Sequence, residues 1–189
     1  MITQNHDGDG DNIFIQGDAI FKTIQKHPTI LAEIINQLGD RLFDHSSEIE
    51  NDISEFDIDG KIEYNNVVRY KYIIDEYMVY QGKLNSIYKE LDDQGSSKKL
   101  ILFKNIELCY IKAKSTYLDR DREADEEDIK IIKRFADEIL ATVEDELLQV
   151  LLMSSNNQQY LEANRVGLAI ILVDAFMRCK ILEEPPKRC

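Results

Sequence analysis

The first residues that could do chemistry are four aspartates near the N-terminus. Asp7, Asp9, Asp11 and Asp18 fall at positions 1, 3, 5 and 12 of an EF-hand-like loop, where carboxylate oxygens could surround a calcium ion. Position 6 of such a loop should be glycine and is Asn12, position 12 should be glutamate, and no helix pattern precedes the loop. A flexible acidic turn explains the same residues, and we therefore predict no metal site in this segment.

Asp59-Gly60-Lys61 is a second candidate, because it matches the D-x-K element of many metal-dependent nucleases. That element needs a strand inside a mixed sheet and a further acid beside the metal, and this sequence offers too little strand pattern for such a sheet. Residues 55–64 alternate apolar and polar side chains on both sides of Asp-Gly, which is a strong signal for a hairpin. We predict a small two-stranded β-ribbon here and keep a metal-dependent nuclease as an alternative function.

A Ser-x-x-Lys spacing occurs in the SSKK run at 96–99, and in serine acyltransferases this spacing places a lysine beside the nucleophile. No partner motif follows, and Ser96 or Ser97 is more simply the N-cap of a helix. Three histidines also lack a cysteine or Gly-x-Ser-x-Gly partner, namely His6, His27 and His45. We predict no catalytic residue and a protein that is not an enzyme.

Basic and aromatic residues are interleaved over 64–117. This stretch holds eight of the nine tyrosines and nine Lys/Arg against six Asp/Glu, an excess of three positive charges in a chain of net charge −13. Such a surface could stack on and neutralise a nucleic-acid strand, with Lys98, Lys99 and Lys104 against its phosphates. Most of the tyrosines follow core spacing, which leaves three to face outward: Tyr64, Tyr72 and Tyr80. A nucleic-acid-binding helical hairpin therefore remains an alternative.

The elements that would position these groups are helices. Apolar residues repeat with 3-4 spacing from Val67 to Leu91 and again from Phe103 to Tyr117, with a turn at 92–97 between them. The short connection predicts a long antiparallel helical hairpin over 66–118. Further helices are predicted over three ranges: 28–38 (ended by Gly39), 127–153 and 159–182.

The last of these helices is apolar almost all round from Val166 to Met177, which predicts the central helix of the bundle. It is too short to span a bilayer. Asp174 and Arg178 are four residues apart and share one face. This pair is either an intrahelical ion pair or part of a docking surface, and our candidate partner-binding residues are Asp174, Phe176, Arg178 and Lys180, beside the Pro185-Pro186 tail.

Composition places the chain in a reducing cytosol. The three cysteines form no CxxC pair, and the first ten residues do not resemble a signal peptide. We predict that Cys109 and Cys179 are small buried hydrophobes and that Cys189 is exposed. The strongly negative net charge argues against general binding to nucleic acid or to anionic membranes. A soluble, cytoplasmic protein is therefore expected.

The predicted fold class is all-α: a helical bundle built on a long antiparallel hairpin, with a small β-ribbon and a flexible arm toward the N-terminus. Residues 1–20 are predicted to be a Gly/Asp-rich arm, 21–54 a short helix with an acidic link, and 55–189 a helical bundle that serves as an interaction module.

Two runs carry a resemblance to a known family: KIEYNNVVRYKYIIDEYMVYQGKLNSIYKELDDQGSSKK at 61–99 and VDAFMRCKILEEP at 173–185. They resemble the helical C-terminal modules of effectors in bacterial ABC-three-component conflict systems, and residues 5–20 resemble the connector that joins such modules to an effector.

The resemblance implies a non-enzymatic adaptor, without a cofactor, in an anti-phage defence complex. Its expected partners are an ATPase of the ABC or structural-maintenance type and an effector, often a nuclease, so any DNA association would be indirect. No effector domain precedes the module in this sequence, which implies a stand-alone component or an effector on a separate chain.

Overall fold

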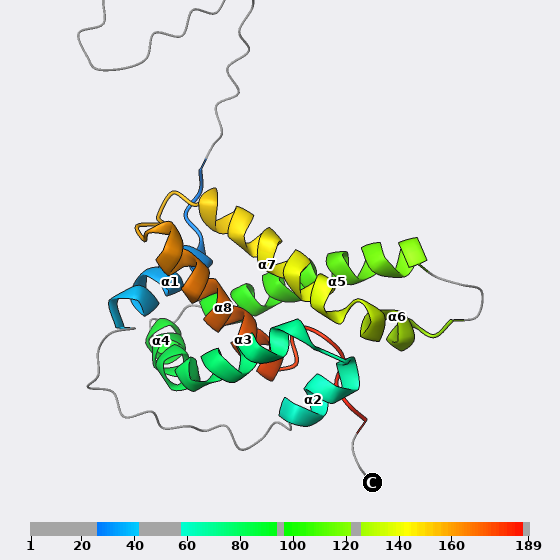
Figure 1. Ribbon diagram of the computed structural model, residues 1–189. Coiled ribbons are helices and arrows are strands. Elements are labelled where there is room, and N and C mark those ends of the chain that lie inside the picture. The colour runs from blue at the N-terminus through cyan, green and yellow to red at the C-terminus, as the bar shows by residue number, and fades with distance from the viewer. Residues whose placement is uncertain (1–25, 42–57, 94–96, 122–125, 187–189) are drawn as a thin grey trace, which may run out of the picture.

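The computed structural model describes residues 26–41, 58–93, 97–121 and 126–186, and within them the chain is all-helical, as predicted (Figure 1). No strand occurs in these ranges apart from a single isolated bridge between His27 and Ser154. The elements in chain order are α1 (Ile30–Arg41), α2 (Ile58–Asn65), α3 (Arg69–Tyr77), a 3-10 turn (Met78–Tyr80), α4 (Gln81–Asp93), α5 (Lys98–Asp121), α6 (Asp128–Arg134), α7 (Ala136–Leu152) and α8 (Leu161–Met177).

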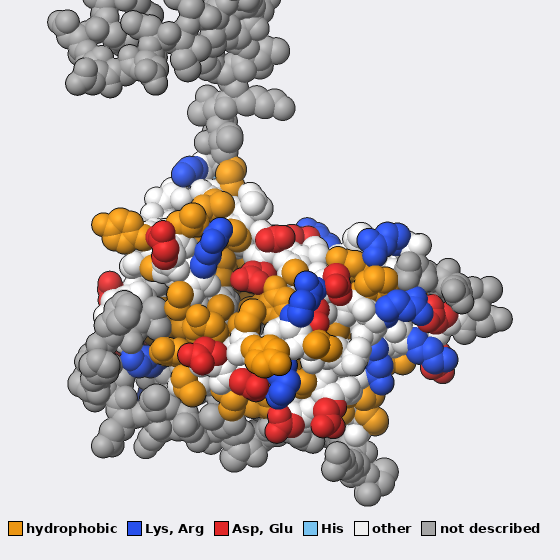
Figure 2. Space-filling view, viewed as in Figure 1, with side chains coloured by type: hydrophobic (Ala, Val, Ile, Leu, Met, Phe, Trp, Pro, Cys, Tyr) orange, Lys and Arg blue, Asp and Glu red, His pale blue; other side chains and the backbone are white. Residues whose placement is uncertain are grey.

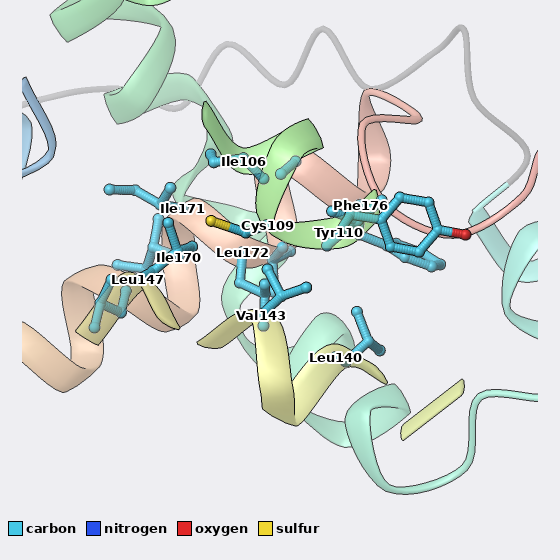
Figure 3. Close-up of a cluster of buried hydrophobic side chains, with 14 of the residues drawn as sticks. Ile106, Cys109, Tyr110, Leu140, Val143, Leu147, Ile170, Ile171, Leu172 and Phe176 are labelled. Carbon is cyan, nitrogen blue, oxygen red and sulfur yellow. The ribbon is translucent and has the colours of Figure 1, made fainter. Parts of the chain in front are cut away.

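Helix α8 is the central helix of the bundle, as its apolar composition predicts. It packs against α1, α3, α4 and α7, and every residue from Gly167 to Met177 is buried. A cluster of buried apolar side chains joins α8 to α5 and α7 (Figure 3). The side chains labelled there are Ile106, Cys109 and Tyr110 of α5, Leu140, Val143 and Leu147 of α7, and Ile170, Ile171, Leu172 and Phe176 of α8.

Helix α1 belongs to the same core, although we expected it to precede the bundle. Its buried residues include Leu31, Ile34 and Ile35, and Ile35 lies against Gly167 of α8. A Cβ added to Gly167 would lie 3.1 Å from side-chain carbons of Ile35, so glycine permits this close approach. Gly39 does not stop the helix, which continues to Arg41.

For the hairpin predicted over 66–118, the residues predicted to face the core do so, but the first arm is not a single helix. The spaced residues from Val67 to Leu91 are buried or half-buried, but Val67 precedes α3 and the others are divided between α3 and α4, with the 3-10 turn between the two helices. The break redirects the chain, because α3 packs on α7 and α8 while α4 packs on α1 and α5. Helix α5 is continuous as predicted, yet its most extensive neighbour is α7 rather than α4.

The helix predicted over 127–153 is broken at Phe135, whose φ of −119° and ψ of 20° separate α6 from α7. Just beyond the break, the buried Asp137 carboxylate accepts hydrogen bonds from the backbone N–H groups of Val68, Arg69 and Tyr70, at 3.0 to 3.2 Å. These are donors that the start of α3 leaves without intrahelical partners. Asp137 therefore caps α3 from another helix, in place of a local N-cap side chain.

The β-ribbon predicted over 55–64 is wrong, because residues 58–65 form helix α2. Ile58, Lys61, Ile62 and Asn65 recur at i, i+3, i+4 and i+7, which places them on one helical face. Ile62 is buried in the core, and Lys61 and Asn65 bond to the C-terminal segment. Tertiary partners thus override the local Asp-Gly turn signal.

The last helix is also shorter than predicted, since α8 ends at Met177 and the chain turns over 178–182. Cys179 and Leu182 have positive φ values of 55° and 59° within this turn. Within the described part of the chain, no helix is long and apolar enough to cross a membrane.

Candidate interaction surface

The two residues of the D-x-K motif lie on different sides of α2. The Asp59 side chain is exposed, whereas the Lys61 ammonium is buried and donates to the carbonyl oxygens of Phe176, at 2.6 Å, and Ile181, at 2.8 Å. It also lies 4.4 Å from the centroid of the Phe176 ring. Burial lowers the pKa of Lys61 to about 8. Lys61 therefore satisfies carbonyls at the end of α8 and does not assist a metal at Asp59.

The C-terminal segment is fixed by a second set of polar contacts. The Asn65 side chain donates to the Glu183 carbonyl at 2.8 Å and accepts from the Glu183 N–H at 3.0 Å. The Glu183 carboxylate accepts from Tyr110 at 2.8 Å and from Lys114 at 2.9 Å, both on α5. Helices α2 and α5 thus fix the turn that follows α8, and these polar residues stabilise the fold.

The remaining catalytic candidates form no reactive pair in the described ranges. His27 is exposed and uses its backbone to bridge Ser154 and Ser155, and Ser97 accepts the Ile101 N–H only through its backbone carbonyl. No described group of three His, Cys, Asp or Glu residues could hold a metal. Several candidates lie outside the described residues: Asp7, Asp9, Asp11, Asp18, His6, His45, Ser96 and Cys189.

A surface hollow of about 350 Å³ lies between α2 and α3. Its charged lining is Asp59, Glu63 and Lys71, with 3.8 Å between the Lys71 ammonium and the Asp59 carboxylate. The side chain of Asp59 is 86% exposed and that of Lys71 43%. Both groups therefore remain hydrated, and the hollow offers no nucleophile with an adjacent base.

The charged stripe predicted on α8 does not face outward. Asp174 is 1% exposed, and its carboxylate accepts from Tyr88 at 3.0 Å and from Arg178 at 2.9 Å. Arg178 also donates to Asn85 on α4. Burial raises the pKa of Asp174, and the Arg178 guanidinium and the Tyr88 hydroxyl oppose that rise. The pair is an intrahelical ion pair, as one interpretation held, but it belongs to the core.

Of the four candidate partner-binding residues, two are accessible. Phe176 is 1% exposed, like Asp174, whereas Arg178 and Lys180 are half-buried. The Lys180 ammonium lies 3.1 Å from the Glu107 carboxylate of α5. Partner contact through Arg178 and Lys180 stays a prediction, while contact through Asp174 and Phe176 would require the end of α8 to open.

Several of the basic side chains lie against aromatic rings of the same chain. Lys and Arg side chains gather at the end where α5 stops and α6 begins (Figure 2). There Arg120 lies 4.9 Å from the Tyr117 ring and 5.2 Å from the Phe135 ring, and Lys133 lies 4.5 Å from the Tyr64 ring. These ring faces are covered by the protein's own cations and are not available to stack on bases.

The three lysines predicted to contact phosphate also have partners within the chain. Lys98 pairs with Glu33 at 2.6 Å, Lys104 pairs with Glu107 at 2.6 Å, and Lys99 lies 5.2 Å from the Tyr88 ring. Of the three tyrosines expected to face outward, Tyr72 is exposed, and Tyr64 and Tyr80 are half-buried. This arrangement gives little support to a nucleic-acid surface.

Sequence reasoning missed an exposed apolar face on α5. Leu100, Ile101, Leu108 and Ile111 are 48% to 59% exposed, and at 100° per residue they fall within an arc of about 100° on the helix. This arc lies opposite the buried face that carries Phe103, Ile106 and Tyr110. We call these four residues the α5 surface. A surface helix normally carries polar residues there.

Cys109 and Cys179, both predicted to be buried, differ in burial. Cys109 is buried, as predicted, and burial raises the pKa of its thiol to about 11. Cys179 lies in the turn after α8 and is only half-buried. Burial likewise raises the pKa of the Cys179 thiol. Neither cysteine is therefore set up as a reactive thiolate.

Comparison with known proteins gives one match. Residues 29–183 match the model of C-terminal domain 10 of the ABC-three component (ABC-3C) systems. No curated protein and no solved structure matches the chain. The match covers all eight described α-helices, the run at 61–99 on which the sequence resemblance rests, and residues 173–183 of the second run at 173–185. The chain thus belongs to the family of C-terminal domain 10 of the ABC-three component systems.

Proposed function

We propose that this protein is a non-enzymatic adaptor of an ABC-three component system, and that it docks a protein partner through the α5 surface. Membership of the family supports a role in such a system. Following the sequence resemblance, the expected partners are an ATPase of the ABC or structural-maintenance type and an effector chain. Binding rather than catalysis is also consistent with Asp59 and Lys61, which face apart across α2.

The observation that carries this proposal is the exposed apolar face of α5. Four large aliphatic side chains share one side of a 24-residue helix, in two pairs separated by Lys104, and remain about half exposed in the folded chain. Exposed aliphatic residues that gather on one side of a helix among polar groups mark binding surfaces more often than residues scattered singly do. Leaving them in water lowers solubility and does nothing for the stability of the isolated chain.

The test is co-purification of the chain with the proteins encoded beside it, comparing Leu108→Arg with Leu152→Arg. Both leucines are exposed to a similar degree, 48% and 43%, but Leu152 lies on α7 outside the α5 surface. We expect Leu108→Arg to remove the partner from the purified complex and Leu152→Arg to retain it. Circular dichroism verifies that both variants are folded. If Leu108→Arg assembles normally, docking through α5 is wrong.

A further inference from the structure

We propose that the occupant of the α5 surface is an amphipathic helix of a partner protein, with acidic side chains beside its apolar stripe. This inference rests on the function proposed above and adds the chemistry of the partner. It follows from three properties of α5: the length and shape of its apolar face, the positive charge around that face, and the pairing of its acidic residue Glu107 with lysines.

The apolar face has the dimensions of a helix-binding site. Leu100 and Ile111 are eleven residues apart, which at 1.5 Å per residue corresponds to about 16 Å, or three helical turns. Apolar residues of a partner helix recur every three to four residues, so a helix of similar length would place three or four of them against this face. A straight, convex helix face suits a second helix lying alongside it.

The charge of α5 is opposite to that of the rest of the chain. Between residues 98 and 118 there are five lysines and a single acid, Glu107, whereas the whole chain has a net charge of −13. Lys112 and Lys104, the second of which pairs with Glu107, are exposed and fall on the same side of the helix as the four aliphatic residues. Lys112 makes no ion pair with any other described residue. Positive charge is thus concentrated where the partner would dock.

The acids near the surface do not cancel this charge. Glu107 lies between two cations, with the Lys104 ammonium at 2.6 Å and the Lys180 ammonium at 3.1 Å. Glu183, in the segment after α8, is paired with Lys114 of α5. Glu146 of α7 lies beside Cys109, on the inner side of α5. A partner with acidic side chains next to its apolar stripe would therefore meet net positive charge.

Other occupants fit these observations less well. A second copy of the chain would bring another lysine-rich α5 and a further charge of −13, so like charges would oppose each other at the interface and over the whole molecule. Nucleic acid would gain little from four aliphatic side chains at the centre of its site, because its binding depends on cations and stacked rings.

The test places the photo-crosslinking residue p-benzoylphenylalanine at Leu108 in the full chain, produced together with the proteins encoded beside it. Mass spectrometry then identifies the crosslinked peptide. We expect a partner peptide with apolar residues at 3-4 spacing and more Asp and Glu than Lys and Arg. The same probe at Leu152 should not yield that peptide. A crosslink to a second copy, to nucleic acid or to a basic segment, or no crosslink at all, would overturn the proposal.

Charge reversal separates this inference from the docking proposal itself. The double variant Lys104→Glu with Lys112→Glu should weaken the complex about tenfold at low salt, with a smaller effect at high salt. Lys89→Glu, on the exposed side of α4, is the matched control and should leave the affinity unchanged. If Leu108→Arg blocks assembly and the double variant binds normally, the docking surface stands and the acidic partner is wrong. If neither change matters, both proposals fail.

Discussion

Helices α8 and α5 both depart from the pattern of a surface helix, since each carries large apolar side chains on more than one side. From Gly167 to Met177 every residue of α8 is buried among the neighbouring helices, including the acidic residue Asp174. On α5 one side is buried against α7, whereas the aliphatic residues on the opposite side stay about half exposed. The two helices therefore use similar residues for different purposes.

The comparison shows that apolar composition alone does not locate a docking surface. The sequence correctly predicts that the apolar residues of α8 form the core, but the charged stripe through Asp174 and Arg178 that we selected for partner binding lies largely in that core as well. The informative residues are the apolar residues of a helix that lie outside its buried face. On α5 these are Leu100, Ile101, Leu108 and Ile111, and they separate binding from folding more clearly than any residue of α8.

The largest effect should come from a matched pair of isoleucines. Ile171 of α8 is 0% exposed and Ile111 of α5 is 53% exposed. Ile171→Ala should lower the free energy of unfolding by about 2–5 kcal/mol, because it removes buried methylene groups and leaves a cavity. Ile111→Ala should change it by less than about 0.5 kcal/mol. Urea unfolding followed by circular dichroism measures both. Equal losses would mean that the α5 surface is covered in the folded protein.

Much of the fold could be predicted because its cause is local. The 3-4 spacing identifies the buried faces of α3, α4 and α5, and it correctly assigns Tyr70, Tyr88 and Tyr110 to the core. The apolar face on α5 also had a local signal: Leu100, Ile101, Leu108 and Ile111 lie opposite Phe103, Ile106 and Tyr110 on a helical projection. That signal was missed because only the residues that fit the core spacing were considered.

Other features had causes far away in the chain. The break at Phe135 lies next to Asp137, whose carboxylate caps the start of α3, some 67 to 69 residues earlier. Helix α2 forms where a turn was predicted because Lys61 reaches carbonyls 115 and 120 residues away. No window of the sequence contains both partners of such a contact, so neither element could be predicted from local pattern.

A second prediction concerns the ion pair inside α8. Arg178→Met removes the cation beside the buried Asp174 carboxylate and should cost about 2–3 kcal/mol near pH 8, less than a fully buried pair because the Arg178 side chain keeps 22% exposure. The pKa of Asp174, already raised by burial, should rise further in this variant.

A carboxyl group whose pKa is higher in the folded state favours folding at low pH, and that contribution is lost as the pH rises through the folded value. The loss in Arg178→Met should therefore be smaller near pH 5 than near pH 8. Urea unfolding at both pH values tests this. Arg41→Met is the matched control, since it breaks the exposed pair with Glu90 and should show no such pH dependence. A variant as stable as the wild type at both pH values would place the pair outside the core.

The smallest of these effects concerns Lys61, which covers the carbonyl end of α8. Its ammonium has a pKa of about 8 in the folded chain, lowered by burial, whereas an unfolded lysine titrates near 10.4. Between these values the unfolded chain binds the proton and the folded chain does not, so stability rises with pH. The wild type should gain roughly 1–2 kcal/mol of unfolding free energy between about pH 7.5 and 9.5, relative to Lys61→Met.

Urea unfolding of both proteins across that range measures the difference, and it is kept below pH 10 because buried tyrosines with raised pKa values, such as Tyr70 and Tyr110, titrate above it. Lys130→Met, an exposed lysine of α6, should keep the pH dependence of the wild type. If the curves of wild type and Lys61→Met run parallel, the ammonium is hydrated and the end of α8 is open to water. In that case α8 would resemble α5 in having an uncovered side, and its last turn, with Asp174 and Phe176, would become accessible to a partner.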